Sequence, residues 1–177
     1  KEIEDLYDNA PCGYHSLDKD GVFLRVNQTE LSWLGYTKDE LVGKKSFADI
    51  LTEDSREDFR KNFSVFKKQG WIRDLEFKLV RKDGTTFPVL LNATAVKGPD
   101  GNYLMSRSTV FDITERKQAE AALAEREQFL KTVVENIPDM IVVKDARDLS
   151  LVSVNKAAED LLGYSREEMI GRNDYHF

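Results

Sequence analysis

The sequence predicts an α+β fold, in which short helices cover one face of an antiparallel sheet, followed by the start of a second copy of the same domain. Three observations support this prediction. Strand-like segments flank Asp-Gly turns. Helix-capping residues surround short apolar segments. The phrase LGYTKDELVGK, residues 34–44, returns as LGYSREEMIGR, residues 162–172.

Composition excludes several classes of protein. The 177 residues carry a net charge of −6 and are 41 % hydrophobic, which suffices for a packed core. Lys and Arg are scattered, so no nucleic-acid partner is expected. No long apolar run or signal peptide is present, so no membrane contact is expected within this region. Cys12 is the one cysteine, which fits a reducing compartment, and we expect a cytoplasmic location.

The sheet is predicted from alternation and turn residues. One hairpin surrounds Lys19-Asp20-Gly21, a second surrounds Asp83-Gly84, and Pro99-Asp100-Gly101 leads into the last strand. Apolar and charged residues alternate around Phe77, so one face of that strand is expected to be exposed to solvent. The five predicted strands lie within residues 14–18, 22–27, 71–84, 85–96 and 102–113.

The helices are predicted from caps and apolar spacing. Residues 28–34 form a short amphipathic turn that ends at Gly35. Thr37 and Glu40 make a capping box for a second short helix. Both are too short to be stable alone, so a sheet must receive their apolar faces. Residues 53–69 form the longest helix of the unit, with acidic residues early and lysines late.

A further helix connects the two copies. Thr114 caps it, Glu115 suits the positive end of its dipole, and Pro138 marks its far limit, which gives residues 115–136. Apolar spacing predicts a seam for a parallel two-stranded coiled coil. The alternative is a monomeric connecting helix whose apolar side chains pack on the sheet of the preceding domain. The seam residues are Ala119, Leu123, Arg126, Leu130, Val133 and Ile137.

These elements together resemble the PAS sensory domain. The segment VNQTELSWLGYTKDELVGK, residues 26–44, the two Asp-Gly hairpins and DITERKQAE, residues 112–120, carry the resemblance. It implies a five-stranded antiparallel sheet in the order 2-1-5-4-3 with short helices over one face, enclosing a pocket. Residues 1–114 are then a complete PAS domain and residues 115–136 the linker helix. Residues 137–177 are the N-terminal part of a second domain, without the long helix and the last three strands.

The resemblance also implies a function. Such domains are input modules of bacterial signalling proteins, most often sensor histidine kinases in two-component systems or diguanylate cyclases. The matching residues Asp112, Ile113 and Thr114 form the junction that passes a change in the pocket to the linker helix. We expect a homodimer, with an output domain in the same protein. A ligand-free dimerisation scaffold is the alternative, and no catalytic residue is predicted within the chain.

The pocket is less well defined by the sequence. Alternation turns either Ser106 and Ser108 or Arg107 and Thr109 toward the covered face. If Arg107 points inward, a small anionic ligand such as a carboxylate is expected. If the serines point inward, the alternative is that they only leave space. The candidate pocket residues are Tyr14, Asn27, Trp33, Phe63, Leu91 and Arg107.

Cofactors known for such domains are tested against individual residues. No histidine lies in the long helix, so haem is not expected. GRNDYHF, residues 171–177, resembles the G-R-N-C-R-F signature of cysteine-adduct flavin photoreceptors, but Asp174 stands in place of the thiol, which excludes the adduct. A flavin bound without an adduct and a small metabolite remain candidates. Cys12 and His15 alone are too few ligands for a metal site.

Overall fold

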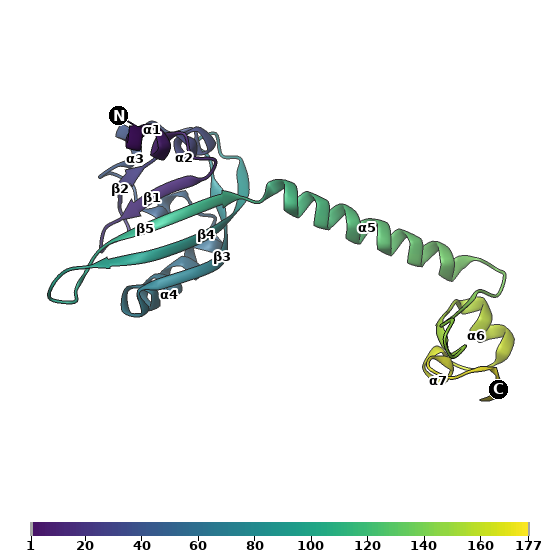
Figure 1. The fold of residues 1–177 in the computed structure, drawn as a ribbon. Coiled ribbons are helices and arrows are strands. Elements are labelled where there is room, and N and C mark those ends of the chain that lie inside the picture. Colours follow the sequence, from purple (N-terminus) through teal and green to yellow (C-terminus); the bar gives the residue numbers. More distant parts are fainter. Residues whose placement is uncertain (1, 177) are drawn as a thin grey trace. The chain divides into compact units, whose positions relative to one another are not determined.

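The chain forms two compact units, Lys1–Lys117 and Gln118–Phe177, in a computed structural model that describes residues 2–176. The first unit contains a five-stranded antiparallel sheet in the order β2-β1-β5-β4-β3 (Figure 1). The α+β class and the strand order are both confirmed. Its strands are β1 (Gly13–Leu17), β2 (Phe23–Val26), β3 (Trp71–Val80), β4 (Thr86–Lys97) and β5 (Tyr103–Asp112).

Helices cover one face of this sheet and form the core with it. The longest, α4 (Glu53–Gln69), packs against β3, as Figure 1 shows. It presents Phe59 and Phe66 to the sheet, as its apolar spacing predicts. The other elements on the helical side are α2 (Gln28–Leu34), α3 (Lys38–Leu41) and the 3-10 helix η1 (Phe47–Ile50). The helix α1 (Glu2–Asp8) precedes the sheet, and its Tyr7 stacks on Tyr14 of β1.

The predicted helix caps are present. Gly35 ends α2 in the left-handed conformation, with φ 74°, where a side chain would be strained. Thr37 and Glu40 form the capping box that begins α3. Leu31, Leu34 and Leu41 of these two helices are buried, so the sheet and the remaining helices supply the packing that such short helices need.

Asn27 fixes α2 to the neighbouring strand. Its Oδ1 accepts hydrogen bonds from the backbone N–H groups of Tyr14 and Glu30, at 2.9 and 3.1 Å. Its Nδ2 donates to the carbonyl oxygens of Tyr7 and Cys12, at 2.9 and 3.0 Å. The side chain is fully buried. One amide therefore satisfies four backbone groups from three segments, as buried polar groups require.

The second unit repeats the opening of the first. Its strands β6 (Val142–Lys144) and β7 (Leu151–Val154) pair in antiparallel fashion, and α6 (Lys156–Leu162) and α7 (Arg166–Met169) follow. Asn155 caps α6 and also bonds the backbone of Ile141, as Asn27 does in the first unit. The last element within the described residues is the 3-10 helix η2 (Asp174–His176).

The connecting helix α5 spans Thr114–Asn136, so it begins one residue before the predicted start. The cap comes from Asp112, whose Oδ1 accepts hydrogen bonds from the backbone N–H and the hydroxyl of Thr114, at 2.8 and 2.5 Å. None of its 23 residues, all of which the structure describes, is buried.

We predict that Asn27→Ala lowers the free energy of unfolding of the first unit by about 3 kcal/mol, because buried backbone groups lose their partners. Urea unfolding of the whole chain, followed by the fluorescence of Trp33 and Trp71, measures this. Gln28→Ala, at the neighbouring exposed position, is the control and should change stability little. A loss below about 1 kcal/mol for Asn27→Ala would show that these hydrogen bonds are dispensable.

Candidate functional site

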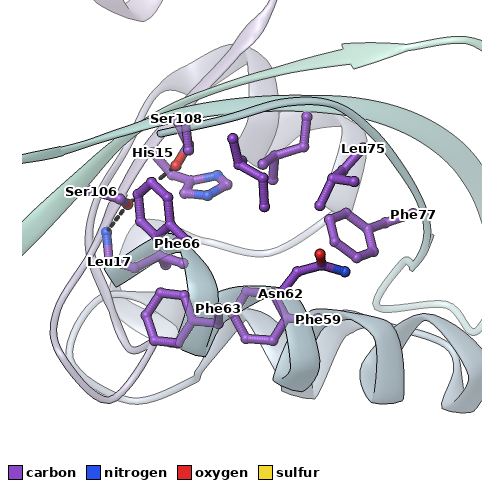
Figure 2. A pocket seen from close by; sticks show the side chains of 13 residues that line it. His15, Leu17, Phe59, Asn62, Phe63, Phe66, Leu75, Phe77, Ser106 and Ser108 are labelled. Carbon is purple, nitrogen blue, oxygen red and sulfur yellow. Dashed lines mark hydrogen bonds between the residues drawn. The ribbon is translucent and has the colours of Figure 1, made fainter. Parts of the chain in front are cut away.

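A small cavity lies between the sheet and α4. Its volume is about 20 Å³, room for roughly one water molecule. Figure 2 shows His15 and Ser108 on the sheet side and the phenylalanines of α4 opposite them. The lining is mainly apolar and includes Phe59, Phe63 and Phe66 from α4. Its lining, apolar with a few convergent polar groups, is that of a small-molecule site, but its volume is far below the roughly 300 Å³ at which such sites begin.

His15 and Glu30 form a buried pair at the edge of this cavity. The His15 Nδ1 lies 2.8 Å from Oε1 and 3.1 Å from Oε2 of Glu30, and both side chains are fully inaccessible to solvent. Glu30 reaches this position because it occupies the first turn of α2, where Asn27 binds its backbone N–H. Gly13 leaves room for the carboxylate, since a Cβ there would lie 3.1 Å from Glu30 Oε2.

Two serines on β5 supply the other buried polar groups. Ser108 Oγ donates to Ser106 Oγ at 3.2 Å, and Ser106 Oγ accepts from the backbone N–H of Leu17 at 3.0 Å. Both hydrogen bonds appear in Figure 2. Nearby, burial raises the pKa of Tyr103 to about 12, so its hydroxyl stays protonated and donates to the Leu17 carbonyl oxygen. These bonds join β5 to β1 beside the cavity.

The predicted pocket residues do not all meet. Phe63 and Leu91 line the cavity. Asn27 is buried but is used as a helix cap and a backbone ligand. Trp33 packs against the edge of the core and borders a separate surface hollow beside Lys82. The structure therefore brings two of the six candidates to the cavity and assigns Asn27 and Trp33 to other positions.

Arg107 and Tyr14 lie on the opposite side of the sheet. Of the two alternatives, β5 turns Ser106 and Ser108 inward and leaves Arg107 exposed, so the choice of Arg107 and Tyr14 as residues of the inner pocket is corrected. Arg107 borders an open hollow of about 390 Å³ on the uncovered face, together with Tyr14 and Trp71. Alternation alone does not decide which β5 side chains face the helices. The pairing of β5 with β1 and β4 decides it.

The predicted transmission residues occupy one junction. Ile113 is buried, and its backbone N–H donates to the Pro88 carbonyl oxygen of β4 at 3.1 Å. Glu76 of β3 binds Arg116 at 2.6 Å and Lys117 at 2.7 Å. The hydrogen bond from Lys117, with the positive charge of Arg116, holds the pKa of Glu76 below its ordinary value. The start of α5, which follows β5 directly, is thus also bonded to β4 through Ile113 and to β3 through Glu76.

Sequence reasoning considered His15 only as half of a metal site and did not select Glu30. Comparison of the two copies contains a signal that both side chains are buried. Val142 pairs with Val154 as His15 pairs with Val26, and Ala158 follows its helix cap as Glu30 does. Apolar counterparts at both positions indicate that His15 and Glu30 are buried. Among residues 2–176, no group of three or more His, Cys, Asp and Glu side chains could hold a metal ion.

Comparison with known proteins identifies the family. A family model described as "PAS domain" matches residues 11–115, more than half of the chain, and another of the same description matches residues 128–176. The chain belongs to the PAS domain family. A crystal structure of the PAS domain of an HTR-like protein from Haloarcula marismortui is 27 % identical, with a TM-score of 0.55 over 63 % of this chain and 89 % of that one.

Curated relatives are signalling proteins. The sensor protein FixL of Bradyrhizobium diazoefficiens is 27 % identical over 161 residues, covering 91 % of this chain and 32 % of the relative. Sporulation kinase E of Bacillus subtilis is 26 % identical over 157 residues, covering 88 % of this chain and 20 % of the relative. The chain thus spans a third or less of these relatives and corresponds to a PAS sensory module of such proteins. Within residues 2–176, no helix has the length and apolarity to cross a membrane.

The buried pair yields a stability prediction. His15→Val should destabilise the protein by about 3 kcal/mol, because it leaves the Glu30 carboxylate buried without its partner. The double variant His15→Val with Glu30→Ala should recover most of that loss, since the second unit holds Val142 and Ala158 at these places. Thermal and urea unfolding of the wild type, both single variants and the double variant complete the cycle. Additive losses would contradict direct coupling of the pair.

Proposed function

We propose that the first unit is the sensory input module of a signalling protein, a sensor histidine kinase, and that it binds a small molecule in its inner cavity. The state of the cavity then passes through Asp112, Ile113 and Thr114 into α5 and on to an output domain of the same protein. The observation that carries this proposal is the course of β5. This strand supplies Ser106 and Ser108 to the cavity and ends at Asp112.

The contacts at the two ends of β5 support the proposal that a change in the cavity reaches α5. At the cavity, Ser106 binds the backbone of β1, so a ligand that displaces the serines also shifts the pairing of β1 with β5. At the junction, Asp112, Ile113 and Glu76 bind the start of α5. A change of angle or register in a helix held in this way is a known form of switching between two states.

The cavity favours a small metabolite over a flavin. Its volume of about 20 Å³ is far below that of an isoalloxazine ring, and the side chains of α4 occupy the remaining space. Any ligand larger than a water molecule requires side chains to move, and Phe63 and Asn62, which line the cavity from α4, are only half-buried. Absorbance of the purified protein between about 350 and 500 nm distinguishes a flavin or haem from a colourless metabolite.

We predict that Asp112→Ala uncouples the cavity from α5 without unfolding the sheet. The variant loses the two hydrogen bonds that cap the helix, which costs about 1 kcal/mol locally. Amide hydrogen exchange should become faster at residues 114–117, while β4 and β5 keep their protection. Asp112→Asn, which retains the accepting oxygen, is the matched control. An Asp112→Ala protein that binds its signal and still regulates its output normally contradicts the proposed path.

Self-association through α5 belongs to the same proposal. Leu123, Leu130 and Val133 of the predicted seam are 59, 53 and 41 % exposed, and Phe129, which the seam did not include, is 65 % exposed beside it. A second copy of the helix would cover these side chains in a parallel coiled coil. Arg126 and Ala119 weaken the seam, which suits a helix that must change register.

We expect Leu130→Glu to shift the protein from dimer to monomer, because it places like charges opposite each other in the seam. Gln128→Glu introduces the same charge on the side of α5 away from the seam and should leave the dimer intact. Sedimentation equilibrium of the two variants and the wild type measures the change. A wild-type chain that is monomeric at high micromolar concentration would contradict pairing.

Two alternatives follow from the same features. A ligand-free dimerisation scaffold would keep α5 and its caps, and it predicts that no small molecule stabilises the first unit. An input module of a diguanylate cyclase would use the same cavity and junction with another output domain. The buried His15 beside the cavity favours ligand binding over the scaffold, because a core that only packs needs no such pair.

A further inference from the structure

The Nε2 atom of His15 has no hydrogen-bond partner among the described residues, although it is buried. His15 itself is 2 % exposed and lines the cavity. Figure 2 shows its ring on the sheet side, opposite the aromatic side chains of α4. A buried polar atom without a partner is costly, so its position beside a cavity calls for an explanation.

The fold does not require this pair. The second unit builds the same hairpin, the same asparagine cap and the same short helix with Val142 and Ala158 in place of His15 and Glu30. Met140 stands there where the first unit has Gly13, the residue that gives Glu30 its space. The second unit thus has no buried charged pair at these two positions and no glycine at the third. The pair is therefore specific to the first unit and absent from the shared architecture.

Burial determines which atom carries the hydrogen. The Glu30 carboxylate has no hydrogen-bonding side chain other than His15 among residues 2–176, so a net charge on the pair would be expensive. Two arrangements have no net charge. In one, imidazolium faces carboxylate; in the other, the carboxylic acid donates its hydrogen to Nδ1 of a neutral ring. In both arrangements Nε2 carries a hydrogen and is a donor.

We propose that the cavity of the first unit binds a small, uncharged molecule through a carbonyl-type oxygen that accepts a hydrogen bond from His15 Nε2. This inference rests on the proposed function and specifies the class of its ligand. The molecule must be uncharged, because the aromatic lining offers no cation to balance an anion and Arg107 lies on the other face. Ser108 already donates its hydroxyl hydrogen to Ser106, and the Asn62 amide donates to the Asp58 carbonyl oxygen, whereas His15 Nε2 is a buried donor without a partner among the described residues.

Two isosteric probes test the hydrogen bond. Cyclohexanone carries the accepting oxygen, and methylenecyclohexane replaces it with a CH2 group of similar size. Their Kd values are measured by NMR titration of the whole chain, in the wild type and in the His15→Val, Glu30→Ala double variant. Comparing the ratio of the two Kd values between the wild type and the double variant cancels the different hydration of the probes. We expect the wild type to favour the ketone by about fivefold more than the double variant does.

A direct readout on the wild type needs no variant. Correlation of imidazole hydrogens with their nitrogens should show a hydrogen on His15 Nε2, and its resonance should move as cyclohexanone binds. A ring without a hydrogen on Nε2 overturns the inference. Tighter binding of cyclohexanecarboxylate than of cyclohexanone overturns it as well, since an anion would then be the preferred class.

The outcomes separate this inference from the proposed function. Equal probe ratios in the two proteins mean that the cavity binds ligands without the hydrogen bond, so the inference fails while small-molecule sensing stands. If neither probe binds the wild type at millimolar concentration, both fail. A ketone preference together with normal regulation in Asp112→Ala supports the inference and removes only the proposed transmission path.

Discussion

The arrangement of the first unit depends on the hydrogen bonds of one buried amide. Asn27 binds the backbone of Tyr14 in β1 and of Glu30 in α2, and so sets the distance between a strand and a helix too short to be stable alone. That distance places the Glu30 side chain against His15. The cavity, the buried pair and the covered face of the sheet all follow from it. Asn155 makes the corresponding bonds in the second unit, which indicates an architectural role.

The two copies separate architecture from function within one chain. Features present in both, such as the asparagine cap, the capping boxes at Thr37 and Ser165 and the glycines in the left-handed conformation, belong to the fold. The His15–Glu30 pair is present only in the first copy. A buried pair of this kind rarely adds stability over apolar residues of similar volume. Its presence beside a cavity is therefore better explained by what it binds than by what it stabilises.

Much of the fold could be predicted from the sequence because local signals agreed with the global pattern. Asp-Gly turns, caps and apolar spacing are short-range features, and they placed every strand and α-helix of the first unit from β1 onward to within a few residues, although the 3-10 helix η1 was not predicted. The site was harder. The face to which Arg107 points depends on pairing between distant strands, and the burial of Glu30 contradicts the usual exposure of a carboxylate in the first helical turn. Both are tertiary properties, so local patterns do not contain them.

The central claim is that occupancy of the cavity changes the start of α5. Amide hydrogen exchange at residues 114–117, measured as cyclohexanone is added, tests it most directly. The account predicts that exchange at these residues changes in proportion to bound ligand in the wild type, and that the change is lost in Asp112→Ala even though the ketone still binds. Saturation of the cavity with no change at residues 114–117 in the wild type would contradict it.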